Sequence, residues 1–249
     1  MNATKWMGGL GGIVCLCATG AQAQLVTNIL TATADTFYDE RSFTHGMTNT
    51  AVQGLYGPPG TNFLDLASEN EPFTQRIVLR FDLSSVPVGS LRSATLRLYN
   101  RAGPFSPNTD FLDVYRLTNP FADNNSNWVT NNFPANTAWT NPGTDFANAQ
   151  GAAQDLSNPF ATTLYDRTSV GAANDWDVTS LVHFWQDGIY ANYGFMINKR
   201  LTQTHQQAFF WSMESGFSPE LIVVTPEPTA LALLGLGGLL LLGRGRTRG

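Results

Sequence analysis

The hydrophobic and polar residues of this chain alternate along short stretches that turn-forming residues separate. Within residues 75–83, Ile77, Leu79 and Phe81 fall on one face and Arg76 on the other. Because successive side chains of a strand point to opposite faces, this pattern predicts a β-strand with one buried face. Many short strands joined by turns are typical of an all-β fold, and we expect an antiparallel, jelly-roll-like β-sandwich. The same criterion predicts further strands at 94–99, 111–117, 193–198, 207–213 and 221–225.

One segment has the periodicity of a helix. Between residues 178 and 187, Leu181, Val182 and Trp185 share one helical face, and Asp177 just before them is a capping candidate. We therefore expect one short helix that closes an end of the sandwich.

The first 23 residues have the layout of a secretory signal peptide. Lys5 is their only charge, an apolar stretch follows, and a small-x-small cleavage site precedes Gln24. Both cysteines, Cys15 and Cys17, lie inside this segment and follow large apolar residues, so we do not expect lipidation. The exported protein would then have no thiol for a disulfide, a zinc site or a nucleophile.

The end of the chain carries a second targeting segment, residues 226–249. Pro226, Glu227 and Pro228 precede an apolar run at 230–242 that predicts a C-terminal hydrophobic helix. Thirteen helical residues span only ~20 Å, against ~30 Å for a hydrocarbon core, so this helix is a marginal anchor. The basic residues that follow should stay cytoplasmic, and they are Arg244, Arg246 and Arg248.

This order of Pro-Glu-Pro, apolar helix and arginines resembles the PEP-CTERM sorting signal of Gram-negative bacteria. The resemblance implies an exosortase-type membrane protease as partner. It also implies export through the inner membrane and transient anchoring there, followed by release to the outer cell surface or the extracellular matrix. We accordingly divide the chain into a signal peptide, an ectodomain and a sorting segment, at residues 1–23, 24–225 and 226–249.

Seven segments of the ectodomain resemble, in order, the DNRLRE domain family. That resemblance implies a jelly-roll-like sandwich on extracellular proteins, with some relatives acting as carbohydrate-binding modules for acidic polysaccharides such as alginate. The segment 127–132 departs from the pattern, because relatives have an acidic residue between a tryptophan and a Val-Thr-Trp-Asn run. The matching segments are 34–37, 76–87, 94–99, 114–117, 138–143, 176–182 and 192–195.

The net charge and the length of the chain limit the partners and the number of domains that we expect. The 249-residue chain has a formal charge of −5, and without the two terminal segments the ectodomain carries about −8. An acidic protein repels phosphate backbones, so nucleic acid is not an expected partner. The roughly 200 residues of the ectodomain suffice for one domain with a substantial core.

Arginines and tryptophans are the candidate ligand-binding residues. Arg76, Arg80 and Arg97 point away from the apolar faces of their strands, and they would form a basic stripe if those strands pair. Such a stripe suits uronate carboxylates, although cross-strand pairing with Asp82 or with Glu residues is the alternative. Trp128 and Trp139 lie in a polar segment, where an indole can stack on a sugar ring or cap the edge of the sandwich.

Calcium is the one cofactor that the sequence suggests. Asp110, Asp113 and Asp123 offer oxygen ligands for a structural Ca²⁺, but their spacing is not that of a dedicated calcium loop. The alternative is that such residues bond to the backbone of their own turns.

Catalysis has less support than binding. The three histidines are isolated, and no glycine-flanked serine or phosphate loop occurs. We therefore expect no enzyme, but a structural or carbohydrate-binding module of a cell-surface or biofilm-matrix protein. The alternative is an extracellular polysaccharide hydrolase or lyase, which would need a carboxyl pair such as Asp110 with Asp113 or Asp175 with Asp177.

The sorting segment gives a direct test. Removal of residues 226–249 should release soluble protein, because the short apolar run is the only predicted anchor left after signal cleavage. The full chain should stay in the membrane fraction until it is processed, as cell fractionation and immunoblotting would measure. Mature surface material that still carries the intact arginine tail would contradict proteolytic sorting.

Overall fold

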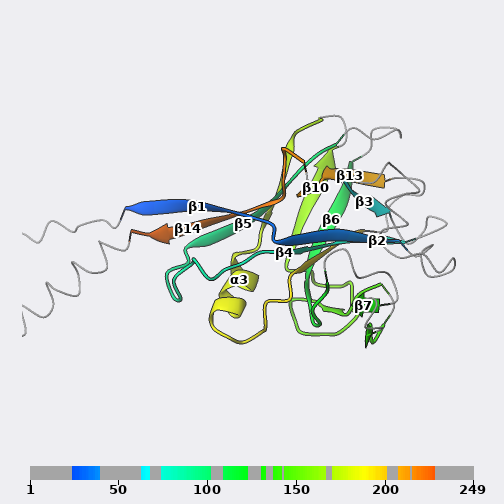
Figure 1. Cartoon of the computed structure of the whole chain (residues 1–249), viewed down its shortest axis with the longest axis horizontal. Helices are drawn as coiled ribbons and strands as arrows, with labels where there is room; N and C mark the ends of the chain where they lie inside the picture. Colours follow the sequence, from blue (N-terminus) through cyan, green and yellow to red (C-terminus); the bar gives the residue numbers. More distant parts are fainter. Residues whose placement is uncertain are drawn as a thin grey trace, which may run out of the picture. The chain divides into compact units, whose positions relative to one another are not determined.

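The part of the chain between the two terminal segments is built from strands, as the alternation predicts (Figure 1). The chain divides into the compact unit Leu25–Pro226 and a second unit of two terminal segments, Met1–Gln24 and Glu227–Gly249. The predicted signal peptide and hydrophobic helix lie outside the described residues. The computed structural model describes residues 24–39, 63–67, 74–101, 109–122, 130–132, 137–141, 143–166, 170–200, 207–213 and 215–227.

Within these ranges, no helix has the length and apolar character that a membrane crossing requires.

The first sheet is antiparallel and has four strands. Along β5, the side chains of Leu96 and Leu98 are buried while Arg97 between them is half-exposed, so the predicted alternation is confirmed here. In spatial order the sheet contains β1 (Leu25–Thr31), β14 (Glu220–Pro226), β5 (Ser93–Tyr99) and β11 (Ala173–Asp177).

The second sheet is also antiparallel and has six strands. Its main path contains β10 (Ala161–Asp166), β6 (Thr109–Leu117), β12 (Phe195–Lys199), β4 (Gln75–Arg80) and β2 (Ala34–Asp39). The short strand β9 (Phe146–Ala147) pairs with β6 beside this path. Two further strand pairs join β13 (Gln207–Trp211) to β3 (Phe63–Ala67) and β7 (Thr130–Asn132) to β8 (Thr137–Ala138).

The main core lies between the two large sheets. Trp176 of β11 is 1% exposed, and its indole N–H donates to the carbonyl of Leu112 on β6 at 3.0 Å. This bond connects the first sheet with the second across the core. The inward-facing aliphatic residues of both sheets surround it, including Ile77, Leu96 and Val223.

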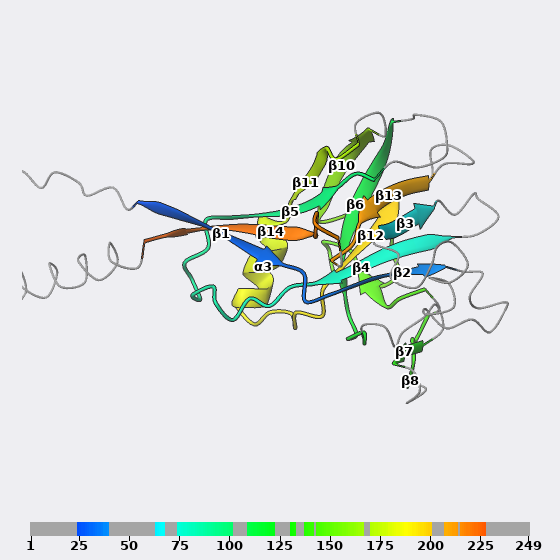
Figure 2. The same cartoon turned by 45° about the horizontal axis from the view of Figure 1, so that its top comes forward.

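The helix α3 (Thr179–Gln186) closes the core beside β5 (Figure 2). Leu181, Val182 and Trp185 are buried, as the helical pattern predicts. The carboxylate of Asp177 accepts bonds from the backbone N–H and the hydroxyl of Thr179, at 3.0 and 2.6 Å. Asp177 therefore caps the first turn from one position before the N-cap residue.

The six-stranded sheet is buried on its outer face as well, which corrects the expectation of a half-buried strand at 75–83. The residues of β4 are buried on both sides, and only Arg80 at its end is partly exposed. A second apolar cluster lies on this outer face, and it comprises Ala34, Tyr38, Val78, Tyr115, Leu117, Phe121, Trp139, Phe146 and Met196.

Three members of that cluster, Phe121, Trp139 and Phe146, come from residues 118–122 and from the described part of 137–160, residues 137–141 and 143–160. We call these residues the cover segment. The ring of Trp139 meets Tyr38 of β2 at 5.8 Å between centroids, and the ring of Phe146 meets Tyr115 of β6 at 5.3 Å. The Tyr115 hydroxyl donates to the carbonyl of Leu156 at 2.6 Å. Aromatic contacts and this bond thus hold the cover segment on the sheet.

Substitution of Phe81 tests whether the main core is assigned correctly. Its ring is 1% exposed and lies 6.0 Å from Phe195, so Phe81→Ala should lower the free energy of unfolding by ~3–5 kcal/mol. Chemical denaturation measures this loss. Val88→Ala, at a residue that is 77% exposed, is the control and should change the same quantity by less than about 0.5 kcal/mol. An unchanged denaturation midpoint for Phe81→Ala would contradict the assigned core.

Candidate functional site

The three arginines of the predicted stripe do not share a surface. Arg76 and Arg80 belong to β4 of the second sheet, whereas Arg97 belongs to β5 of the first. Arg97 forms two bonds of 2.7 Å with Asp175 on the neighbouring strand, and this partner raises the pKa of its guanidinium. β4 and β5 therefore do not pair as the stripe would require. Arg97 does form a cross-strand ion pair, but with Asp175 and not with Asp82 or a glutamate.

Arg76 lies beneath the cover segment. It is 8% exposed, its Nη1 donates to the carbonyl of Gly143 at 3.1 Å, and its Cζ lies 5.1 Å from the centre of the Phe146 ring. A polymer chain cannot reach a guanidinium in this position. The role of Arg76 here is to attach the cover segment to the sheet.

Of the two candidate tryptophans, only Trp139 lies in the described part of the chain. Trp139 is 4% exposed inside the outer cluster, so it packs in the fold and presents no face to a sugar. Trp128 and Asp123 lie outside the described residues, as does the side chain of Asp110.

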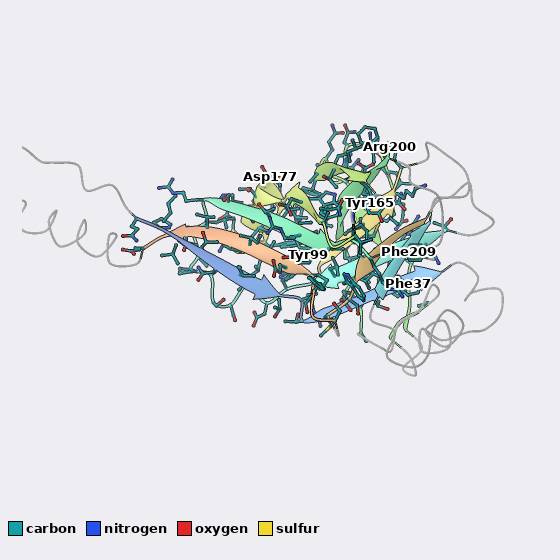
Figure 3. All side chains as sticks on the ribbon, turned by 90° about the horizontal axis from the view of Figure 1, so that it is seen from above. Phe37, Tyr99, Tyr165, Asp177, Arg200 and Phe209 are labelled. Carbon is teal, nitrogen blue, oxygen red and sulfur yellow. The ribbon has the colours of Figure 1, made fainter. Side chains whose placement is uncertain are left out.

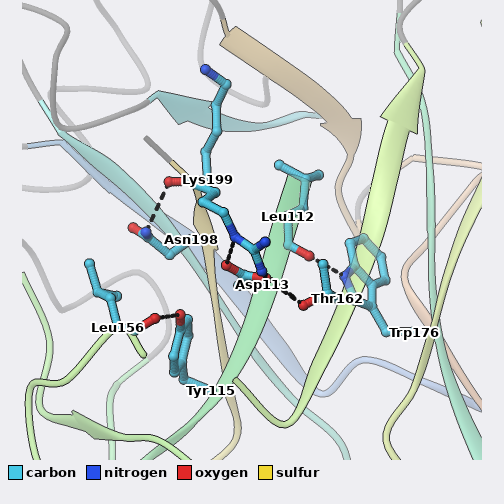
Figure 4. A network of polar contacts seen from close by, with 9 residues as sticks. Leu112, Asp113, Tyr115, Leu156, Thr162, Trp176, Asn198 and Lys199 are labelled. Carbon is cyan, nitrogen blue, oxygen red and sulfur yellow. Dashed lines mark hydrogen bonds and ion pairs between the residues drawn. The ribbon is translucent and has the colours of Figure 1, made fainter. Parts of the chain in front are cut away.

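Asp113, the remaining calcium candidate, is held in an ion pair (Figure 4). Arg200 donates to its two oxygens at 2.9 and 2.6 Å, and the hydroxyl of Thr162 adds a bond of 2.6 Å. Arg200 and Thr162 thus occupy both oxygens of this carboxylate. The described part of the chain contains no group of three or more His, Cys, Asp or Glu residues with the geometry to hold a metal.

Asp145 organises the cover segment. It is 3% exposed and accepts bonds from the backbone N–H groups of Thr140 and Asn141, both at 2.8 Å, and from the side chain of Asn119 at 2.6 Å. Burial alone would raise the pKa of Asp145, but these donors lower it below its ordinary value. The carboxylate thus joins the two parts of the cover segment.

Several other carboxyl groups are also stabilised as anions. Bonds from Ser84, Ser157 and Thr179 lower the pKa values of Asp82, Asp155 and Asp177, respectively. A glycosidase acid needs the opposite environment, one that raises the carboxyl pKa towards neutrality. Among the described carboxyl groups with a resolved shift, none has a raised pKa.

Arg80 is the last residue of β4, and the N–H donors of its guanidinium are available to a ligand. Its Cζ lies 5.5 Å from the centre of the Phe121 ring, and its side chain forms no hydrogen bond or ion pair with the described residues. Asp82, two residues on, accepts bonds from the N–H and hydroxyl of Ser84 instead, both at 2.9 Å. Arg80 therefore remains a candidate for ligand binding.

Arg116 is a second arginine that lies against an aromatic ring and forms no hydrogen bond with the described residues. It shares the inward-facing positions of Leu112 and Val114 on β6, and its Cζ lies 3.9 Å from the centre of the Tyr190 ring. Burial lowers the pKa of this guanidinium, and no carboxylate of the described residues offsets that effect. Its side chain forms no hydrogen bond within the described ranges, so a half-buried charge is left without an acceptor there.

Arg80 and Arg116 lie at the same end of the six-stranded sheet. Phe195 of β12 pairs with Leu79 on one side and with Arg116 on the other, so the arginine backbones are two strands, or ~10 Å, apart. Their side chains leave opposite faces of the sheet, each over an aromatic ring. We call this group the arginine rim, and it comprises Arg80, Phe121, Arg116 and Tyr190.

The sequence contains a signal for the missed member of the rim. In the alternation of β6, Arg116 follows Leu112 and Val114 at positions that face the core. A charged residue at an inward position is unusual unless it is paired or lies at the end of the strand, and it is therefore a marker of a candidate site.

Most of the chain matches a known protein family. A family model described as "Disaggregatase related repeat domain" matches residues 49–221, a range that contains both arginines of the rim. The DNRLRE resemblance stays a prediction beside this match. A search of curated proteins found no match to the chain.

The contribution of Asp145 to the free energy of unfolding should depend on pH. Asp145→Asn should lower the free energy of unfolding by about 1.5–3 kcal/mol at neutral pH, because bonds to a buried anion are lost. The folded-state pKa is below the unfolded value of about 3.9. The carboxylate therefore stabilises the fold fully above that pH, and its contribution disappears as the pH falls through the folded pKa.

Denaturation at pH 7 and at decreasing pH values measures this effect, and the difference between wild type and variant should shrink below about pH 4. Asp187→Asn is the control, because that exposed carboxylate accepts no hydrogen bond from the described residues. Equal destabilisation by both substitutions would contradict the role given to Asp145.

Proposed function

The chain belongs to the disaggregatase-related repeat domain family, and from this membership and the arginine rim we propose an exported, non-catalytic module that binds acidic polysaccharide at the cell surface. The single observation that carries the proposal is the pair of arginines at one sheet end. Arg80 and Arg116 present guanidinium groups without an acceptor among the described residues.

The chemistry of the rim fits a uronate. A guanidinium is planar and presents donors in a fork that matches the two oxygens of a carboxylate. The rings of Phe121 and Tyr190 lie against Arg80 and Arg116, which limits the orientations of both groups. A partly dehydrated guanidinium also gains more from a carboxylate than one in bulk water does, because the local dielectric is lower.

Two features support binding without catalysis. The described carboxyl groups with resolved shifts have lowered pKa values, whereas a general acid at neutral pH needs a raised one. Asp175 and Asp177, one of the pairs considered for hydrolysis, form bonds with Arg97 and Thr179.

Export and sorting complete the proposal. The signal peptide would deliver the chain across the inner membrane, where the segment 226–249 would anchor it until an exosortase-type protease acts. The module would then reach the outer surface or the matrix and bind acidic polysaccharide there.

Titration calorimetry of the purified protein with alginate, and with dextran as a neutral counterpart, tests the binding site. Arg80→Ala and Arg116→Ala should each weaken alginate binding by ~1–3 kcal/mol, which corresponds to about 5- to 150-fold. Arg116→Lys should recover only part of the loss, because an ammonium keeps the charge but not the fork. Added salt should weaken wild-type binding, since exposed charges are screened over ~10 Å at 0.1 M.

Arg92→Ala is the matched control, because Arg92 is exposed and lies outside the rim. Its affinity for alginate should equal that of the wild type. Equal losses in Arg92→Ala and Arg116→Ala would indicate non-specific charge attraction, and the absence of alginate binding by the wild type would overturn the proposal.

A product assay separates the module from a hydrolase or a lyase. Incubation with alginate should yield neither new reducing ends nor unsaturated products. Turnover that depends on a carboxyl group of this chain would refute the non-catalytic account.

A further inference from the structure

A second surface of the ectodomain carries an exposed aromatic ring, Phe217, in the loop between β13 and β14. Phe217 is 51% exposed. An apolar ring of this size normally gains free energy by leaving water, so its position must be maintained by its surroundings.

Hydrogen bonds fix the loop that presents this ring. The carbonyl of Ser212 accepts bonds from the N–H and the hydroxyl of Ser215, at 3.0 and 2.8 Å. The N–H of Phe217 then donates to the Ser215 hydroxyl at 3.0 Å, and the Ser218 hydroxyl donates to the carbonyl of Met213 at 3.0 Å. Asp35 accepts the N–H of Met213 at 2.6 Å, which joins the loop to β2.

Two further rings support Phe217 from beneath. Trp211 of β13 stacks on it with centroids 6.1 Å apart and planes at 28°, and Tyr99 of β5 lies 5.8 Å away at 56°. Both supporting rings are half-buried, and Tyr99, which Figure 3 labels, is the last residue of β5. We call Phe217, Trp211 and Tyr99 the aromatic platform.

Polar groups beside the platform match sugar hydroxyls. The carboxylate of Glu220 accepts the Tyr99 hydroxyl at 3.0 Å and retains further lone pairs. The indole N–H of Trp211 donates no hydrogen bond within the described part of the chain. A pyranose has an apolar C–H face that can cover a ring, and hydroxyls that can both donate to a carboxylate and accept from an indole N–H.

The charges beside the platform are of both signs. Glu220 pairs in register with Arg97, which Asp175 binds, while the Cζ of Arg101 lies 5.6 Å from the centre of the Trp211 ring. An uncharged sugar can cover the rings without placing a carboxylate beside Glu220.

We propose that the aromatic platform is a separate binding surface for neutral pyranose units, with the ligand stacked on Phe217. It differs from the arginine rim in ligand charge and in position, because it involves β5, β13 and the loop before β14. It does not rest on acidic polysaccharide binding, so either site can fail without the other.

Titration of the purified protein with soluble hexasaccharides of β-1,4-linked glucose, β-1,3-linked glucose and β-1,4-linked mannose tests this surface. At least one should bind, with little dependence on salt. Phe217→Ala should weaken that binding by about tenfold or more, and Phe217→Tyr should keep it within about threefold, since the ring remains.

Phe111→Ala is the matched control, because Phe111 is also an exposed phenylalanine, 41% exposed on β6, but lies outside the platform. This variant and Arg116→Ala should bind the hexasaccharide as the wild type does. Circular dichroism and the melting temperature check that each variant is folded.

Three results would overturn the proposal: no binding of any hexasaccharide by the wild type, equal losses in Phe217→Ala and Phe111→Ala, or unchanged binding in Phe217→Ala. Analytical sedimentation of the same samples tests the alternative that a second copy of the chain covers Phe217. Self-association that Phe217→Ala abolishes, without sugar binding, would replace the sugar with a second copy of the chain.

Discussion

Burial of both faces of the six-stranded sheet is the constraint on which the other features depend. Its inner face packs against the first sheet and α3, while its outer face presents Tyr38, Val78 and Tyr115 to the cover segment. Irregular backbone over an apolar face is stable only if its polar groups are bonded. Asp145 accepts two of these backbone N–H groups, those of Thr140 and Asn141, and the side chain of Asn119, so one buried carboxylate joins two parts of the cover segment.

The extent of the cover segment determines which arginines of the six-stranded sheet a ligand can reach. Arg76 lies under it and bonds to Gly143, whereas Arg80 lies where β4 ends and rests on Phe121 of the cover segment itself. Arg116 lies at the corresponding end of the main core, against Tyr190. The same packing that removes one arginine from solvent therefore orients two others at the sheet end.

Local elements could be predicted from the sequence because their signals are local. The alternation of β5 and the helical face of α3 each depend on side chains a few positions apart, and both predictions are confirmed. The stripe of arginines failed because it needed β4 and β5 to pair. They follow one another in the chain but enter different sheets, and alternation within a strand carries no information on its partner.

The position of Trp139 shows a second limit. Its polar neighbours in the sequence suggest a surface loop, yet the indole is buried against Tyr38. Aperiodic segments give no pattern from which burial can be read. Arg116 was within reach of sequence reasoning, because a charge at an inward strand position is visible in the alternation.

Hydrogen–deuterium exchange with and without alginate tests the proposed binding site most directly. The account predicts slower exchange at residues 80–84, 117–122 and 187–194, which adjoin the arginine rim, and no change at 93–99, which carry Arg97. Protection confined to 93–99, or no change at a saturating alginate concentration, would contradict the account.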